Sequence, residues 1–205
     1  MKVLIINGSP HSNGNTAIAI NEMVKVFEAE GVETQIVQVG NKAVRGCTAC
    51  GNCFGKGKCV FDDIVNETAP LFEAADGLIV AAPTYYASAN GTIISFLDRL
   101  FYSAHFDKTM KVGASVVVAR RGGAASTFDE LNKYFTMNQM PVASSQYWNM
   151  IYGRTQGEAA QDAEGLQTMR TLARNMVFLM KSIALGKEKF GLPEKEQWTP
   201  THFIR

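Results

Sequence analysis

The sequence predicts an α/β fold in which a parallel sheet is covered by helices on both faces. Three observations support this prediction. Five short apolar runs alternate with segments whose apolar residues recur at helical spacing. Several of the runs are continuous rather than alternating, which is typical of strands buried on both faces. No internal repeat, low-complexity tract or linker interrupts the 205 residues, so we expect residues 1–205 to form one domain.

The first half of the chain contains two strands and two helices. The helical spacing stops before Gly31, a residue type that commonly follows a helix end. Asp62 and Asp63 provide the capping oxygens that begin a helix. The expected elements are a strand at Val3–Ile6, a helix over 15–30, a strand at Thr34–Val39 and a helix from Asp62-Asp63 to about Ala74.

The second half continues the alternation. Pro83 closes the third strand, and a pair of arginines followed by two glycines closes the fourth. The expected elements are strands at Gly77–Ala82, Val112–Ala119 and Val142 to about Trp148, and helices at Ile93–Phe101, 126–139 and Gly165–Leu185. The tail over 186–205 is charged and then contains Trp198, Phe203 and Ile204, apolar residues that we expect to be docked rather than free.

Composition limits the partners and the compartment. Apolar content of 46% and charged content of 19% are ordinary for a globular protein. The net charge of +1 gives no reason to expect binding to nucleic acid or to an anionic membrane. The N-terminal apolar run is too short for a signal sequence or a membrane span. These observations predict a cytoplasmic protein, in which thiols stay reduced and a disulfide framework is not expected.

The loop after the first strand, Gly8-Ser9-Pro10-His11-Ser12-Asn13-Gly14-Asn15-Thr16, is suited to a phosphate. It lies directly before a helix, whose first N–H groups and dipole attract anions. Five residues separate its glycines and Asn15 occupies the lysine position, which excludes a Walker loop. No acid ends the second strand, which argues against a dinucleotide. A terminal monophosphate fits, as in flavin mononucleotide (FMN). The alternative is a polar turn with helix caps.

Three loops in order carry a family resemblance. The loop at 8–16 resembles the GSPRxxGNT loop of the flavodoxin-like NAD(P)H-dependent FMN reductases. Residues 82–91 (APTYYASANG) resemble their second flavin loop, and Asp98-Arg99 matches the helix that follows. Gly122-Gly123 with Phe128–Leu131 resembles the third loop, and Gly153 with 162–172 resembles the final loop and helix. The resemblance covers almost the whole chain.

The resemblance implies a flavodoxin-like, doubly wound, three-layer α/β/α fold with strand order 2-1-3-4-5. It implies bound FMN at the carboxyl ends of the strands, with hydride supplied by NAD(P)H. The flavin chemistry requires no protein acid or base, so we assign no catalytic residue. The expected FMN contacts are Ser9, Pro10, His11, Ser12, Asn13, Asn15, Thr16, Pro83, Thr84, Tyr85, Tyr86, Ala87, Ser88, Arg121, Gly122 and Gly123. Alternatively, the tyrosines are edge-of-core aromatics and Arg120 and Arg121 are simply solvated.

Four cysteines, Cys47, Cys50, Cys53 and Cys59, lie within thirteen residues in a CxxCxxCx5C pattern. We define residues 41–62 as the cysteine loop. Three interpretations fit this spacing. It resembles the compact motif of iron–sulfur flavoproteins, which implies a [4Fe–4S] cluster beside the flavin. Four thiolates also suit a structural zinc ion. The third interpretation is that the thiols are buried or redox-active residues without a metal.

The motifs and the resemblance lead to two hypotheses for the function, and a third has less support. The first is an oxidoreductase that passes electrons from NAD(P)H through FMN to a flavin, a quinone or a similar small-molecule acceptor. The alternative is an iron–sulfur flavoprotein reduced by ferredoxin. A non-enzymatic flavodoxin-like module is disfavoured, because flavodoxins are strongly acidic and this chain has a net charge of +1. The resemblance also implies a homo-oligomer, either a dimer or a tetramer.

Overall fold

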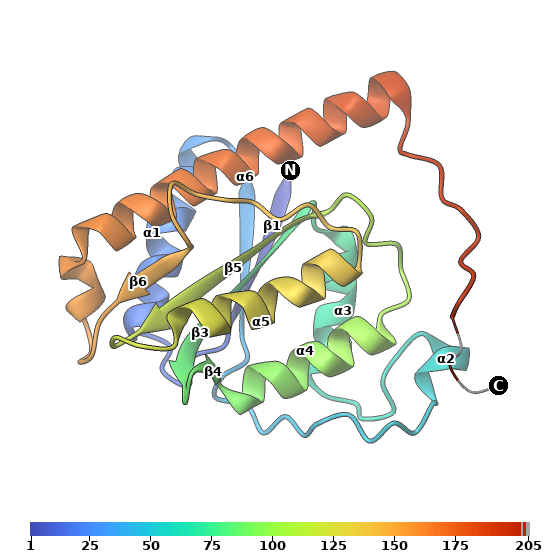
Figure 1. Ribbon diagram of the computed structural model, residues 1–205, viewed down its shortest axis with the longest axis horizontal. Helices are drawn as coiled ribbons and strands as arrows, with labels where there is room; N and C mark the ends of the chain where they lie inside the picture. The colour runs from blue at the N-terminus through green and yellow to red at the C-terminus, as the bar shows by residue number, and fades with distance from the viewer. Residues whose placement is uncertain (202, 204–205) are drawn as a thin grey trace.

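The computed structural model describes residues 1–201 and 203 and contains one central sheet (Figure 1). Its strands are β1 (Lys2–Asn7), β2 (Glu33–Gln38), β3 (Gly77–Tyr85), β4 (Ser88–Ala89), β5 (Val112–Ala119) and β6 (Met150–Tyr152). The main path runs β2-β1-β3-β5-β6, with every neighbouring pair parallel, and β4 pairs with β3 in antiparallel orientation. Apart from the short β4, this is the expected order 2-1-3-4-5.

Helices cover both faces of the sheet. They are α1 (Asn15–Ala29), α2 (Cys53–Lys56), α3 (Ile64–Ala74), α4 (Gly91–Ser103), α5 (Ala124–Met137) and α6 (Ala163–Phe190), with a short 3-10 turn, η1 (Glu158–Gln161). Helices α1 and α6 pack on one face, and α3, α4 and α5 pack on the other. The predicted three-layer, doubly wound fold is therefore confirmed.

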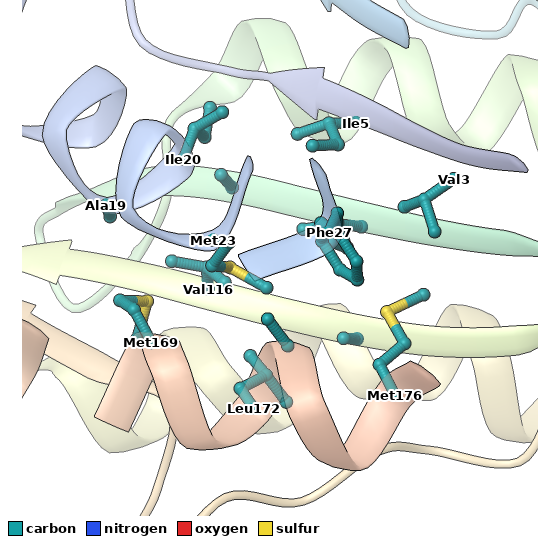
Figure 2. Close-up of a cluster of buried hydrophobic side chains, with 14 of the residues drawn as sticks. Val3, Ile5, Ala19, Ile20, Met23, Phe27, Val116, Met169, Leu172 and Met176 are labelled. Atoms are coloured by element: carbon teal, nitrogen blue, oxygen red, sulfur yellow. The ribbon is translucent and has the colours of Figure 1, made fainter. Parts of the chain in front are cut away.

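Alternate residues of β1 pack into different layers. Val3 and Ile5 contact the α1 and α6 side, where Phe27 and Leu172 are fully buried (Figure 2). Leu4 and Ile6 face the opposite cluster, so the strand is apolar on both sides. Burying each such side chain contributes about 1.5–3 kcal/mol. This two-sided burial explains why the run is continuous in the sequence.

The last strand of the parallel path, β6, lies further along the sequence than predicted. Val142 makes only an isolated bridge to Gly113, and the paired strand is β6 at Met150–Tyr152. The chain between them turns instead of pairing, because polar groups bond within it: the Ser145 hydroxyl bonds the side chain of the buried Asn149 at 2.8 Å. The predicted strand from Val142 to Trp148 is therefore wrong beyond its first residue.

The C-terminal tail also differs from the prediction. Helix α6 continues to Phe190, five residues beyond the predicted end at Leu185. Trp198 is 81% exposed and Phe203 is 93% exposed, so these side chains are not docked within their own chain, docking against a second subunit stays a prediction, and Ile204 lies outside the described residues. The tail makes an exposed ion pair between Lys195 and Asp107, at 2.7 Å. Among the described helices, none has the length and apolarity needed to cross a membrane.

Candidate functional site

A cavity of about 340 Å³ lies where the carboxyl ends of β3 and β5 meet the loops after β1, β5 and β6. All of these segments lie at the carboxyl ends of parallel strands or just beyond them, the edge at which doubly wound sheets bind ligands. The cavity is lined by Ser9, His11, Gly14, Asn15, Thr16, Pro83, Thr84, Tyr85, Val118, Ala119, Arg120, Gly153, Arg154 and Gln156. Loops that are far apart in the sequence thus form one site.

The loop at 8–16, which the sequence predicts to bind a phosphate and which we call the phosphate loop, borders this cavity. The N–H of Ser9 donates to the Asn7 side chain at 3.0 Å, and the Ser9 hydroxyl accepts the N–H of His11 at 3.2 Å. Gly14 is the N-cap of α1 and supplies no side-chain cap, while its carbonyl accepts the N–H groups of Ala17 and Ile18. Within the described chain this leaves the first two N–H groups of α1, those of Asn15 and Thr16, for a ligand. Gly40 packs on this loop, because a Cβ there would stand 2.2 Å from the Gly8 carbonyl oxygen.

The Asn15 side chain has a different role from the predicted one. Its amide nitrogen donates to the Thr155 carbonyl at 2.9 Å, and its oxygen accepts the N–H groups of Gly157 and Ala159 at 3.0 and 3.2 Å. The side chain therefore ties the start of α1 to the loop after β6. Asn15 lines the cavity, but the bonds of its amide are made to protein backbone.

The second flavin loop is a tight hairpin between β3 and β4. Tyr85 lines the cavity and is half-exposed, whereas Tyr86, at the tip, is fully exposed. Tyr86 and Ala87 have φ angles of 51° and 60°, in the left-handed region. The Ser88 hydroxyl donates to the Glu130 carboxylate at 2.8 Å, so this group is also engaged within the protein.

The third loop brings Arg120, rather than Arg121, to the cavity. Gly123 has a φ of +85° and packs against Ala87 of the hairpin. Arg154 and Gln156 were not predicted from the sequence, because the misplaced fifth strand hid the fact that they follow a strand end. The expected contacts that lie in these loops but outside the cavity lining are Pro10, Ser12, Asn13, Tyr86, Ala87, Ser88, Arg121, Gly122 and Gly123.

The four cysteines line a second, small pocket of about 20 Å³ together with Arg99, Tyr102 and Ser103 of α4. Cys53 is 9% exposed, Cys59 is partly buried, and Cys47 and Cys50 are exposed. The Asn52 N–H and side chain hydrogen-bond the Cys50 sulfur and lower the pKa of its thiol. In the described part of the chain, no three Cys, His, Asp or Glu side chains are grouped closely enough to hold a metal ion.

The buried side chain of Arg99 lines this pocket and bonds the residues around it. Its guanidinium is 1% exposed, donates to the Cys59 sulfur at 3.2 Å, and forms a two-pronged ion pair with Asp63 at 2.7 and 2.9 Å. It also lies over the Phe61 ring. Burial alone would lower the pKa of Arg99, but the bonds to Asp63 and Cys59 outweigh burial and raise it. A permanent positive charge therefore adjoins one cysteine sulfur.

The two sites lie at different places along α4. This helix begins at Gly91, just after the hairpin, whereas the cysteine pocket uses residues 99–103 near the helix end. Figure 1 shows the cysteine loop running from the end of β2 alongside α4 to α2. The lining residues of the cavity and the pocket do not overlap. The four cysteines therefore border a pocket separate from the cavity, and the expectation that a cluster lies beside the flavin stays a prediction.

Comparison with known proteins identifies the family of this chain. Residues 1–154 match the family model described as NADPH-dependent FMN reductase. The chain belongs to the NADPH-dependent FMN reductase family. Its sequence is 30% identical over 191 residues to an iron–sulfur flavoprotein of Methanocaldococcus jannaschii, covering 89% of this chain and 99% of the relative. It is 31% identical over 193 residues to an iron–sulfur flavoprotein of Methanosarcina thermophila, covering 92% and 100%.

Solved structures of related shape support the fold. A structure of RosB with a bound flavin-derived intermediate superposes with a TM-score of 0.70 at 17% identity, covering 100% of this chain and 94% of that one. An archaeal flavodoxin superposes with a TM-score of 0.58 at 15% identity, covering 88% and 99%. At this level of identity the likeness concerns the fold alone. This member of the FMN reductase family thus has a flavodoxin-like fold.

The cavity of this family member fits FMN. Its volume lies in the range of small-molecule sites, about 300–1,000 Å³. Free N–H donors at the start of α1 suit the phosphate, and Pro83 with Tyr85 offers an apolar wall for a flat ring. Phosphate binding in this cavity would depend on backbone N–H donors more than the sequence predicted, because the Asn15 side-chain amide is already bonded to the loop after β6.

The cysteine pocket fits an iron–sulfur cluster by its donors but not by its present space. Four thiols border one pocket and one sulfur adjoins a guanidinium, which is favourable for thiolate ligands. A volume of about 20 Å³ has room for roughly one water molecule. Loading a cluster would therefore require the exposed part of the loop that carries Cys47 and Cys50 to move outward.

Proposed function

We propose that this protein is an iron–sulfur flavoprotein, in which FMN in the carboxyl-edge cavity and a [4Fe–4S] cluster on the four cysteines exchange electrons. One observation carries the proposal: Cys47, Cys50, Cys53 and Cys59 border one pocket against a buried arginine. The relatives named iron–sulfur flavoproteins, each covering about nine-tenths of this chain, support it. A reduced cytoplasmic compartment would keep the thiols available for ligation.

The residues of the chain bind and orient the cofactors. The first N–H groups of α1 would hold the FMN phosphate, and Pro83 and Tyr85 would contact the ring. When bound, FMN supplies the conversion between two-electron and one-electron transfer. Arg99 would offset negative charge on the Cys59 sulfur. No side chain is required to transfer a proton.

Anaerobic purification tests this function. We expect an absorption spectrum containing flavin bands and a broad iron–sulfur shoulder, with about four iron and four sulfide per chain. Cys53→Ser should remove the iron and leave the flavin, whereas the matched loop variant Thr48→Ser should retain both. Protein purified without air that contains flavin but no iron or sulfide would contradict the proposal.

A second candidate is an NAD(P)H-dependent reductase that passes electrons to a flavin, a quinone or another small-molecule acceptor. The match to NADPH-dependent FMN reductases favours it, as do the exposed Arg120 and Arg154 at the cavity. Guanidinium groups of this kind suit a nicotinamide-nucleotide phosphate. Arg154→Gln should raise the KM for NADPH by about tenfold with little change in kcat. Absence of NADH and NADPH oxidation with either acceptor would exclude this candidate.

The surface of the cysteine loop suits an acidic electron donor such as ferredoxin. Lys42, Arg45, Lys56 and Lys58 are all exposed, and no acidic residue occurs over 34–61. We expect reduction by ferredoxin to slow as salt rises, and Lys56→Glu with Lys58→Glu to slow it at low salt. A rate independent of salt would argue against this partner.

We also propose a homo-oligomer, either a dimer or a tetramer, to be tested by light scattering.

A further inference from the structure

The hairpin between β3 and β4 has an unusual turn. Its register pairs Tyr85 with Ser88, which leaves Tyr86 and Ala87 as a two-residue connection. Both have positive φ, a combination normally supplied by Asn-Gly or another glycine-containing pair. Side chains such as tyrosine and alanine rarely adopt this conformation. Because the Tyr86 side chain is fully exposed, its own burial does not hold the turn in place.

Helix α5 holds the hairpin through side-chain hydrogen bonds. The Ser126 hydroxyl donates to the Ala87 carbonyl at 2.7 Å. The Glu130 carboxylate accepts the Ser88 hydroxyl and the Ala89 N–H, both at 2.8 Å. Residues 126 and 130 are one helical turn apart and share a face of α5. The turn is therefore bonded at its tip and just after it by one helix.

Close backbone packing completes this attachment. Gly123 precedes α5 and has a φ of +85°, and a Cβ there would stand 2.6 Å from the Ala87 Cα. The Thr84 and Thr127 hydroxyl groups are 3.2 Å apart, within hydrogen-bonding distance. The start of α5 thus contacts the hairpin before, at and after its turn. Strained backbone of this kind persists only where surrounding groups hold it.

We propose that Glu130 is a positioning residue, which holds the strained Tyr86–Ala87 turn so that Tyr85 is placed in the cavity before flavin binds. This inference rests on the proposed function, since it assigns the cavity to FMN. Glu130 does not line the cavity and acts through Ser88 and Ala89. A loop that is already ordered loses less entropy on binding, so Glu130 increases flavin affinity without touching the ligand.

Flavin titration of the cofactor-free protein tests the role of Glu130. Quenching of flavin fluorescence gives the Kd for FMN and for riboflavin, which lacks the phosphate. We expect Glu130→Ala to raise the Kd for FMN and the Kd for riboflavin by about tenfold each. The two increases should be similar, because the variant disturbs the ring end of the site and not the phosphate end. The matched control Asp129→Ala, one residue earlier and exposed, should stay within about twofold.

A rescue variant separates positioning from general destabilisation. Replacing Tyr86 by Asn and Ala87 by Gly supplies the preferred turn sequence. In the Glu130→Ala background this double change should restore most of the riboflavin affinity. Hydrogen exchange of the Ala89 amide in the flavin-free protein should speed up in Glu130→Ala and not in Asp129→Ala.

Different outcomes overturn different claims. A wild-type protein that binds neither flavin would overturn the proposed function, and this role of Glu130 with it. Wild-type binding with unchanged affinity in Glu130→Ala would overturn the positioning role alone. Failure of the Asn-Gly turn to restore affinity, or unchanged Ala89 exchange, would also overturn it.

Discussion

At the scale of single residues, Arg99 links α4 to the cysteine loop and to Asp63. Its guanidinium bonds Asp63 through two nitrogens and Cys59 through a third, in a position 1% exposed. Removing one partner of a buried ion pair is strongly destabilising, because the other charge is left without compensation. Lysine keeps the charge but has no planar fork with which to reach both groups.

We therefore expect Arg99→Lys to lower the free energy of unfolding by about 3 kcal/mol. Arg45→Lys is the matched control, because Arg45 also lies over the Phe61 ring but is exposed. Its effect should stay within about 0.5 kcal/mol. Urea unfolding of the cofactor-free variants measures both. Equal losses for the two variants would show that the ion pair with Asp63 contributes nothing.

Asn15 gives a second expectation at this scale. Asn15→Ala removes three hydrogen bonds to the loop after β6, and this loop supplies Gly153, Arg154 and Gln156 to the cavity. We expect stability to fall by about 2 kcal/mol and FMN affinity to fall by about tenfold, as the loop loses its tie to α1. Asn13→Ala, in the same phosphate loop, is the comparison and should change stability by less than about 0.5 kcal/mol.

The sequence identified Asn15 and Arg99 but not their roles. The position of Asn15 between a strand and a helix indicated a phosphate donor, and nothing local to it indicated a bond to residues 155–159. Arg99 was noticed only as part of an Asp-Arg pair, because its partner Asp63 is 36 residues away. Long-range hydrogen bonds leave no periodic pattern, so side-chain roles of this kind required the fold.

At the scale of elements, strands were predicted correctly where the apolar pattern was strong. They were misplaced where hydrogen bonds between polar groups determine the local structure. The continuous runs of β1, β3 and β5 were located to within a few residues, because burial on both faces leaves a clear pattern. Strand β6 was misplaced because the segment before it resembles a strand in sequence but forms a turn, in which the Ser145 hydroxyl bonds the Asn149 side chain. The β3–β4 hairpin was not predicted as a strand pair, since Tyr-Ala is not a usual turn sequence.

The packing of α1 against α6 includes a titratable contact. Glu22 of α1 bonds Lys25 at 2.9 Å and Arg170 of α6 at 2.5 Å. These bonds, that of Lys25 first, lower the pKa of Glu22 below its ordinary value. A lowered pKa in the folded state means that the contact stabilises the protein above the unfolded-state pKa of about 4.3. The stabilisation is lost as the pH falls through the lower, folded-state value.

We expect Glu22→Gln to lower stability by about 0.5–1 kcal/mol at pH 7 and to have progressively less effect below about pH 4. Glu28→Gln, on the same helix and exposed, should be nearly neutral across this range. Thermal unfolding from pH 3 to pH 7 measures the difference between the variants. A loss for Glu22→Gln that does not change with pH would contradict the ion-pair explanation.

At the scale of the whole molecule, two chemically distinct sites occupy one sheet-and-helix scaffold. The cavity draws on loops at the carboxyl ends of four strands, whereas the cysteine pocket rests on the last turns of α4. Helix α4 advances about 1.5 Å per residue, so its Arg99 lies about 12 Å beyond its start at Gly91. The cavity is built on the sheet and the cysteine pocket on α4 and the cysteine loop, and no lining residue is shared between them.

This separation predicts that the sites can be emptied independently. Replacing Cys47 and Cys53 by Ser should abolish iron binding and leave the Kd for FMN within about twofold, because neither side chain borders the flavin cavity. Conversely, Gly40→Ala should weaken FMN binding strongly, since a Cβ would collide with the phosphate loop, while the four thiols remain in their pocket. Iron analysis after anaerobic purification and flavin titration of the stripped protein measure the two responses separately. A loss of FMN affinity above about tenfold in the cysteine variant would mean that the loop, although distant along α4, supports the cavity through the backbone that joins Gly40 to the cysteines.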